Sequence, residues 1–145
     1  MAYQGVRETS PNRGPWIDEC LRFVGLDPEA GSWPWCAASL VWCAHRGGVE
    51  LLRTAGVARL WRSVQARRIG GPEQGCGFVH LNADGTGHCG FVIGETPDGK
   101  VATVSGNTNE EGSREGTKVG LHDKPYDYFI GGGFFHLRQE EGGGG

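Results

Sequence analysis

The sequence predicts an α+β fold in which N-terminal helices pack on a C-terminal antiparallel β-sheet. Before Gly70, apolar residues recur at helical spacing, whereas beyond it short β-type runs are separated by Gly, Asp and Pro. Helices first and strands second are typical of a segregated α+β layout. A length of 145 residues with 37% hydrophobic residues suits one domain. We expect this domain to span residues 1–139, followed by a Gly-rich tail or linker at 140–145.

Three helices are expected in the first half of the chain, over residues 15–25, 35–44 and 57–67. The first is bounded by Pro15 and Gly25, which are typical of a helix start and a helix end. The second is apolar on nearly all sides, so it is expected to be the buried central helix. The third is amphipathic, and its apolar residues share one face.

Five strands are expected in the second half, over residues 75–81, 88–95, 101–105, 118–122 and 128–137. Between the second and third of these lies the turn 97–100, with Asp98-Gly99 as a favoured central pair. These runs predict an antiparallel sheet, with the buried helix packed on one of its faces.

Composition excludes several function classes. A net charge of −3 and a pI near 5.9 argue against nucleic-acid binding, because phosphate neutralisation needs a clustered basic excess. The one basic cluster, Arg59 to Arg68, is interpreted as a solvated helix face. Residues 1–14 hold no apolar run of signal-peptide length, and no stretch approaches a membrane span. We expect a monomer made in the cytosol without a signal peptide, and no nucleic-acid or membrane partner.

Five cysteines form an odd set without a regular framework, which favours a reducing compartment over a disulfide scaffold. Among them, Cys36 lies in the first turn of the predicted central helix. Unpaired N–H groups and the positive end of the helix dipole lower a thiol's pKa there and can hold the oxyanion of a tetrahedral intermediate. Position alone leaves open a second interpretation, in which Cys36 is a small core residue like Cys43.

A thiol nucleophile needs a base, and His88 is the best placed of the five histidines because it opens a strand after a polar turn. His45 is about 13 Å from Cys36 along the helix axis, too far for proton transfer, and is expected to act as a charge partner at the helix C-terminus. The other three, His80, His122 and His136, are interpreted as hydrogen-bonded structural residues of strands.

A third residue that orients the imidazole can be located by counting outward from the 97–100 turn. Simple pairing sets His88 opposite Asn109, and a shift of one or two residues from a bulge or a longer loop sets it opposite Asn107. Either amide could accept from one ring N–H and fix the tautomer. Without the hairpin geometry, Asn107 would be interpreted as an ordinary turn residue.

Two other function classes compete with a thiol hydrolase. The first is a zinc site, since Cys76, His80, His88 and Cys89 offer nitrogen and sulfur ligands. Their spacing argues against it, because adjacent strand residues point to opposite faces and no Cys-x-x-Cys knuckle is present. The second is a non-catalytic module that binds the cell wall. The presence of a complete set of candidate catalytic residues argues against this class.

Three segments together resemble the CHAP branch of the NlpC/P60 superfamily, and the resemblance spans nearly the whole chain. They are Pro34-Trp35-Cys36-Ala37-Ala38, Gly87-His88-Cys89-Gly90-Phe91-Val92, and Gly106-Asn107-Thr108-Asn109 followed by Gly112-Ser113-Arg114-Glu115-Gly116. The resemblance implies a papain-like fold with Cys36 as nucleophile, His88 as base and Asn107 as the residue that orients it. It also implies a cysteine peptidase or amidase that hydrolyses bacterial peptidoglycan, as phage endolysins and wall-remodelling enzymes do. Such a protein reaches the wall after release by a holin, by tail delivery or by lysis.

The chain departs from the family's pattern at two points. The strand before the histidine usually follows Gly-Asp, whereas here the segment begins Gly75-Cys76-Gly77, without the acidic residue. The acidic calcium-binding loops of some CHAP lysins are not evident either. We therefore expect no metal and no cofactor. The resemblance leaves open which bond is cut. Enzymes that cut a peptide bond within the wall peptide and enzymes that cut the N-acetylmuramoyl amide bond share this kind of site.

Overall fold

The computed structural model describes residues 15–30, 35–108 and 118–138. The helical elements are α1 (Pro15–Phe23), α2 (Cys36–Arg46), α3 (Val57–Ser63) and two 3₁₀ helices, η1 (Gln65–Arg67) and η2 (Tyr126–Phe129). The strands are β1 (Arg68–Ile69), β2 (Gly77–Leu81), β3 (Gly87–Glu95), β4 (Val101–Thr108), β5 (Lys118–Lys124) and β6 (Gly133–Phe135). The Gly-rich tail expected at 140–145, and the domain end expected at 139, lie outside the described residues.

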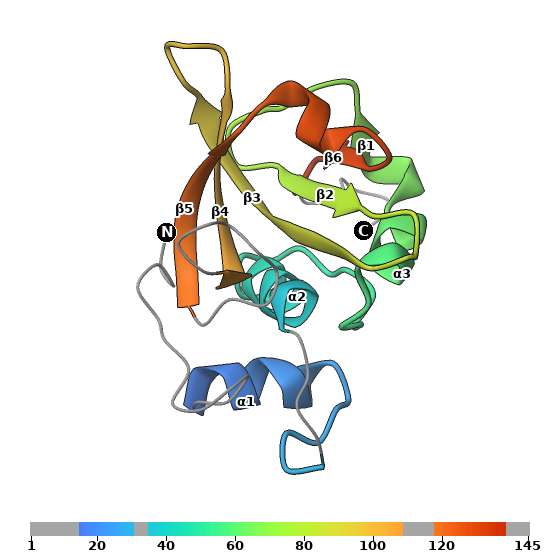
Figure 1. Ribbon diagram of the computed structural model, residues 1–145. Coiled ribbons are helices and arrows are strands. Elements are labelled where there is room, and N and C mark those ends of the chain that lie inside the picture. The colour runs from blue at the N-terminus through green and yellow to red at the C-terminus, as the bar shows by residue number, and fades with distance from the viewer. Residues whose placement is uncertain (1–14, 31–34, 109–117, 139–145) are drawn as a thin grey trace.

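The six strands form one antiparallel sheet in the order β1-β6-β2-β3-β4-β5. Strands β2 to β5 lie side by side in the order in which they occur along the chain, and the chain then returns so that β6 pairs with both β2 and β1. This places β3 in the interior of the sheet, with a partner on each side (Figure 1). Side chains at the start of β3 are therefore surrounded by protein.

The helices form layers against one face of the sheet. Helix α2 packs on β3 and β4, α3 packs beside it on β2 and β3, and α1 packs on α2 on the side away from the sheet (Figure 1). The apolar core between α2 and the sheet includes Leu40 of the helix and Val79, Cys89 and Val104 of the strands, none of which is exposed. The predicted α+β arrangement, with an apolar helix packed on an antiparallel sheet, is confirmed.

A second, smaller core lies on the other face of the sheet. Its buried members come from β2, β3, β4, β6 and η2: Phe78, Val92, Val101, Phe129 and Phe134, with Cys76 just before β2. The ring of Phe129 packs edge-on against Phe78, with 5.6 Å between ring centroids. Because successive strand residues face opposite sides, β3 contributes to both cores, with Cys89 on the α2 face and Val92 on the η2 face.

The predicted strand 128–137 is wrong in part. The chain forms η2 there, closed by a hydrogen bond from the Tyr128 N–H to the Pro125 carbonyl (3.0 Å), and only Gly133–Phe135 is extended. Gly131 has φ +96° and Gly133 has φ +153°, conformations that side-chain-bearing residues rarely adopt. Three consecutive glycines therefore interrupt the apolar run that suggested a single strand.

The predicted third helix, 57–67, also differs. The α-helix ends at Ser63, a 3₁₀ turn follows, and residues 68–69 form β1. Arg67 is only 8% exposed, and its guanidinium donates 2.8 Å to the carbonyl of Arg138, while its own carbonyl accepts from the N–H of His136. The interpretation of this basic cluster as a solvated face is therefore wrong for Arg67, which connects η1 to the segment after β6.

The β3–β4 hairpin has the shifted register that the sequence allowed. Its turn is centred on Gly99, at φ +84°, and residues 96 and 100 are joined across it by a hydrogen bond from the Thr96 N–H to the Lys100 carbonyl. Strand pairing then slips by one residue between Val92 and Gly94. The longer loop and the bulge together displace the register by two residues from simple pairing across the turn.

None of the helices within the described residues combines the length and the apolar character that crossing a bilayer demands.

Candidate active site

Cys36 is the first residue of α2 and is 1% exposed. The preceding residue, Trp35, is the N-cap with φ −119° and ψ 10°, and its side chain makes no capping hydrogen bond. Trp35 is fully buried and packs edge-on against Trp16. A Cβ built on Gly106 would lie only 2.4 Å from Cζ3 of Trp35. The absence of a side chain at Gly106 therefore lets the helix start approach β4 closely. The N–H groups of the first turn of α2 point out of the helix without intrahelical partners.

His88 and Cys89 are the second and third residues of β3 and lie opposite the last residues of β4, at the end of the hairpin away from its turn. Glycines on either side of them allow close packing of the strands. A Cβ at Gly87 would lie 2.2 Å from the carbonyl oxygen of His80, and one at Gly90 would lie 2.4 Å from that of Val104. No such contact is tolerated by a real Cβ, so glycine is required at both positions.

The ring of His88 is held by one nitrogen and leaves the other available. Nε2 lies 2.7 Å from the hydroxyl oxygen of Ser105, which is 2% exposed. Nδ1 is buried and has no hydrogen bond of normal geometry among the described residues. With Ser105 as the acceptor, Nε2 carries the hydrogen and Nδ1 keeps a lone pair. A buried imidazole nitrogen without a partner is uncommon, and it is the arrangement that a general base needs.

The pKa of the Cys36 thiol is lowered well below its ordinary value. The largest cause is a side-chain hydrogen bond from the Cys89 thiol, and burial opposes it. A side-chain interaction with His88, the charge of that ring and the backbone N–H of Cys89 lower the pKa further. Cys36 is thus favoured as a thiolate although it is buried, because several groups around it stabilise the anion.

The other cysteines have pKa values shifted in the opposite direction. Burial raises the pKa of Cys20 and Cys76, and it raises the pKa of Cys43 to about 12. The pKa of Cys89 is raised well above its ordinary value, first by burial and then by its contact with Cys36. All five are free thiols. Cys36 alone among them has a lowered pKa, unlike its core neighbour Cys43.

The contact between His88 and Cys36 is a loose one. The ring is close enough to lower the pKa of the thiol, yet Nδ1 makes no well-formed hydrogen bond to it. Catalytic hydrogen bonds are often long in the absence of substrate and shorten in the complex. The two groups thus lie near each other without a hydrogen bond of normal geometry, and Ser105 holds the ring through Nε2.

The structure and the sequence point to different residues as the one that orients the His88 ring. Continuing the β3–β4 register from the pair Phe91 and Val104 sets Asn107 opposite His88, but the side chain of Asn107 is not among those described, and Asn109 lies outside the described residues. Ser105, which sequence reasoning missed, is the described residue that contacts the ring. It is the diagonal neighbour of His88 across the hairpin, a relation that the register could have indicated.

The remaining histidines have structural contacts. His45 pairs with Glu50 and packs at a tilt against Phe23, with 4.8 Å between ring centroids, near the C-terminal end of α2. His80 stacks on Tyr128 at 4.1 Å between ring centroids, and its Nδ1 lies 2.7 Å from the Tyr128 carbonyl. His80 is the cross-strand neighbour of His88 but is engaged elsewhere.

The four candidate ligands of the alternative zinc site do not lie together in the structure. Cys76 belongs to the core on the η2 face, whereas Cys89 belongs to the core on the α2 face, so the sheet separates them. In residues 15–30, 35–108 and 118–138, no group of three or more histidine, cysteine or acidic side chains is placed to hold a metal ion.

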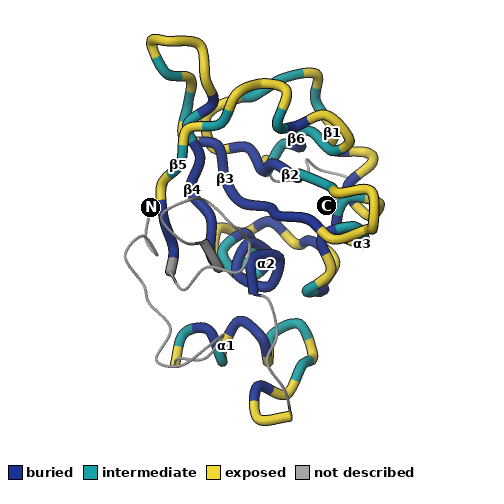
Figure 2. The backbone as a smooth tube through the Cα atoms, in the orientation of Figure 1, coloured by how far each residue is buried: buried dark blue, intermediate teal, exposed yellow. Residues whose placement is uncertain are grey.

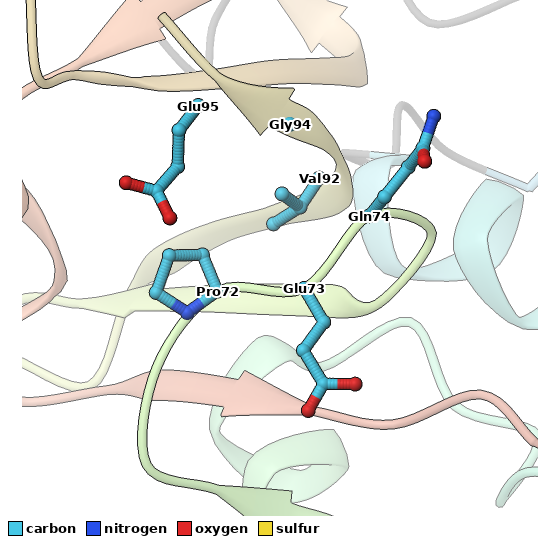
Figure 3. Close-up of a pocket in the computed structure, with 6 residues that line it drawn as sticks. All are labelled: Pro72, Glu73, Gln74, Val92, Gly94 and Glu95. Carbon is cyan, nitrogen blue, oxygen red and sulfur yellow. The ribbon is translucent and has the colours of Figure 1, made fainter.

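A hollow elsewhere on the surface contains two carboxylates. It lies between the segment before β2 and the end of β3, and is lined by Pro72, Glu73, Gln74, Val92, Gly94 and Glu95 (Figure 3). The carboxylates of Glu73 and Glu95 point in different directions (Figure 3). Glu73 lies 3.9 Å from Arg138, and Glu95 accepts a hydrogen bond from the Tyr126 hydroxyl. Both are engaged separately, so this hollow does not form a paired-carboxylate site.

Comparison of the chain with family models, with curated proteins and with solved structures finds no match. A function therefore has to be inferred from the chemistry of the site itself.

Proposed function

We propose that the chain is a papain-like cysteine hydrolase of the CHAP type that cuts peptide or amide bonds in bacterial peptidoglycan. One observation carries the chemical part of this proposal: Cys36, at the start of α2, has a lowered pKa beside a histidine whose Nε2 contacts Ser105 and whose Nδ1 has no hydrogen-bond partner of normal geometry among the described residues. The resemblance of the PWCAA and GHCGFV segments to CHAP proteins supports the choice of substrate.

In the proposed first step, the Cys36 thiol gives its proton to Nδ1 of His88. The resulting thiolate attacks the carbonyl carbon of the scissile bond, and the carbonyl electrons move onto oxygen. The first-turn N–H groups of α2 are suited to receive this oxyanion, because they lack intrahelical acceptors and lie at the positive end of the helix. One helix start would thus favour both the attacking anion and the intermediate that it forms.

The protonated His88 then gives the proton on Nδ1 to the leaving amine, and the tetrahedral intermediate collapses to a thioester on Cys36. Water attacks the thioester, and His88 takes a proton from it as Cys36 leaves as a thiolate. Ser105 would hold the ring through Nε2 in both steps. Neither step uses a metal or a cofactor.

Burial of the proposed nucleophile, Cys36, limits the access of a peptidoglycan strand to the site. Because Cys36 is 1% exposed and His88 4% exposed, a wall peptide reaches the thiol only if the groups that cover it move apart. Such movement would also bring Nδ1 and the sulfur into hydrogen-bond geometry. We therefore expect a low turnover on small soluble amides and a higher one on intact wall fragments.

The test is digestion of purified peptidoglycan by the parent protein and by Cys36→Ala, with products identified by mass spectrometry. The parent should release fragments with new amino and carboxyl ends, and the variant should lose at least about 10³-fold in rate, since no other group replaces the nucleophile. The masses also identify the bond, because cleavage at the N-acetylmuramoyl amide and within the peptide leave different fragments.

Cys43→Ala is the matched control, since it removes another thiol of the same helix whose pKa is raised. It should retain the parent's rate. Release of fragments by correctly folded Cys36→Ala would overturn the thiol mechanism. A parent that reacts with thiol reagents at Cys36 but releases no fragment would overturn peptidoglycan as the substrate and leave the thiol chemistry in place.

A further inference from the structure

The arginines of α3 and β1 form a basic surface to which the proposed mechanism gives no role. Residues 51–72 contain five arginines and no lysine, histidine or acidic residue, although the chain as a whole has a net charge of −3. Three of these arginines, Arg59 and Arg62 of α3 and Arg68 of β1, are exposed, and we call them the arginine face. Positive charge is therefore concentrated on one part of an acidic protein.

Two members of the arginine face repel each other. Arg59 and Arg62 are one helical turn apart, on the side of α3 opposite the buried Val57 and Leu60. Neither forms an ion pair with a described carboxylate. Like charges at this spacing destabilise a helix, and an anion bound between them removes that cost.

The third member, Arg68, is fixed beside this pair. Its guanidinium lies 3.8 Å from the centroid of the Trp61 ring, and its Nη2 donates 2.6 Å to the Trp61 carbonyl. Trp61 is half-buried, with 6.5 Å between its ring centroid and that of Phe135, so it gives the guanidinium a firm support. Because Arg68 is already held in place, it loses little freedom when its remaining N–H groups bind an anion.

The geometry of the arginine face suits a chain of phosphates. Residues three apart on a helix have Cβ atoms about 5–6 Å apart, so the long side chains of Arg59 and Arg62 can reach successive anions of one polymer. A guanidinium presents a planar set of N–H donors that matches the oxygens of a phosphate. Three such groups side by side therefore favour a polymer with repeated phosphodiesters over a single small anion.

The surroundings of the arginine face argue against a nucleic acid and against a bilayer. Proteins that bind single-stranded nucleic acid stack the bases on aromatic rings, but Trp61 is the one aromatic residue of α3, η1 and β1, and Arg68 covers its ring. Insertion into a bilayer needs exposed apolar side chains beside the basic ones. None of the large apolar side chains that are exposed among the described residues belongs to α3, η1 or β1.

We propose that the arginine face binds a phosphate-bearing polymer of the bacterial cell wall, in which polyol units are joined by phosphodiesters. The choice of a wall polymer rests on the proposed function, because a peptidoglycan hydrolase meets such chains at its substrate. Helix α3 lies beside the strand that carries the proposed base (Figure 1). A Cβ at Gly87, the residue before His88, would lie 3.2 Å from Cγ1 of Val57, the first residue of α3. A polymer bound on α3 would thus hold the wall close to the site.

The test measures the fluorescence anisotropy of a labelled poly(glycerol phosphate) oligomer at pH 7, in 50 mM and in 200 mM NaCl. Arg59→Gln/Arg62→Gln removes two charges of the arginine face from exposed positions. It should bind about tenfold more weakly than the parent in 50 mM NaCl and depend less on salt, since fewer counterions are released. Arg59→Lys/Arg62→Lys keeps both charges and should lose no more than about threefold.

Arg22→Gln/Arg46→Gln is the matched control, because it removes the same charge from exposed arginines of α1 and α2. It should stay within about twofold of the parent, since salt screens charges that lie far from the bound polymer. Equal losses in the two glutamine variants would show that only net charge matters and would overturn the proposal. A parent that does not bind the oligomer in 50 mM NaCl would overturn it as well.

Two further probes identify the kind of polymer. They are a single-stranded DNA with the same number of phosphates and vesicles that contain phosphatidylglycerol. The parent should bind the DNA no more tightly than the polyol phosphate and should not sediment with the vesicles. Tighter binding to DNA, or vesicle binding that Arg59→Gln/Arg62→Gln abolishes, would assign the arginine face to another partner and contradict the choice of a wall polymer.

Binding and cleavage can be separated. The anisotropy measurement involves no hydrolysis, so failure of peptidoglycan cleavage leaves it readable. With walls as substrate, the parent should digest intact walls faster than walls from which hydrofluoric acid has removed the phosphate polymers, and Arg59→Gln/Arg62→Gln should digest both at one rate. Equal rates of the parent on both kinds of wall would refute the role of the arginine face and leave the hydrolase in place.

Discussion

The two ends of β3 differ in their environment although they belong to one strand. At its start, residues 87–91 are buried between β2 and β4 and include the proposed base His88, whereas Ile93 and Glu95 near its end are exposed (Figure 2). Both ends carry side-chain hydrogen bonds, from His88 to Ser105 at one and from Tyr126 to Glu95 at the other. The comparison teaches that burial, more than the number of hydrogen bonds, decides what a substitution costs.

Substitutions cost less at the exposed end of β3 because water can replace a lost hydrogen-bond partner there. A polar group that loses its partner at the exposed end bonds to solvent, but one at the buried start is left without a partner or forces the strands apart. The same holds for volume: an added methyl group at the exposed end enters open space, whereas at the buried start it meets backbone. Substitutions of one kind at the two ends should therefore separate widely.

The largest difference is expected between two glycine-to-alanine substitutions. At Gly90 the new Cβ would lie 2.4 Å from the Val104 carbonyl oxygen and 2.6 Å from the Ser105 Cβ, and backbone cannot yield without breaking the β3–β4 pairing. Gly90→Ala should lower the free energy of unfolding by about 3 kcal/mol. At Gly94 nothing lies within 4 Å, so Gly94→Ala should change it by less than about 1 kcal/mol.

Urea denaturation of the two variants at pH 7 measures this difference. Equal destabilisation by Gly90→Ala and Gly94→Ala would contradict the comparison, because the two ends of β3 would then tolerate volume alike.

A smaller effect is expected at Gly106, where the obstacle is a side chain. A Cβ there would lie 2.4 Å from Cζ3 of Trp35 and 3.0 Å from Oγ of Ser39, both on or next to the first turn of α2. Gly106→Ala should cost about 2 kcal/mol of stability and displace the helix start from the strands. The sharper readout is the reactivity of Cys36: its alkylation at pH 6 should fall, since the groups on β3 that lower its pKa would lie farther from it. An unchanged rate would show that the position of α2 does not set the ionisation of the thiol.

Ser105→Ala tests the hydrogen bond at the buried start without changing the backbone. The variant removes the only described partner of the His88 ring and leaves Nε2 buried and unsatisfied, so the free energy of unfolding should fall by about 1–2 kcal/mol. Hydrolysis should slow about tenfold, because the ring can then rotate away from the thiol. Ser105→Thr keeps the hydroxyl and serves as the matched variant. Loss of activity in both to the same degree would point to packing and not to the hydrogen bond.

Much of the fold followed from local sequence patterns, for reasons that these residues illustrate. Helix α2 was predicted because ten nearly continuous apolar residues favour burial, and all of them except Trp42 and Cys43, which are partly buried, are buried. The β3–β4 hairpin was predicted because Asp98-Gly99 meets the backbone demands of a turn, with Gly99 at positive φ. The strand expected over 128–137 was wrong because apolar composition does not report the glycines' conformations at 131 and 133.

The candidate site could be predicted only where one element determined it. The position of Cys36 at a helix start is local, and the structure has α2 begin at that residue. The contact of His88 with Ser105 follows from the β3–β4 register, which counting from the turn gives only once the bulge is known. The lowered pKa of Cys36 depends on how a helix docks on a sheet, which no spacing along the chain encodes.

The smallest effect is expected at the exposed end, from Tyr126→Phe. The phenol donates a 2.5 Å hydrogen bond to Glu95, and that carboxylate raises the pKa of Tyr126, yet both side chains are in contact with water. Solvent replaces the lost bond, so the melting temperature should stay within measurement error of the parent between pH 6 and 9, and the alkylation of Cys36 should be unchanged. A clear loss of stability, comparable to that of Ser105→Ala, would mean that η2 fastens the β3 end through this bond, and that exposure does not diminish what the bond contributes.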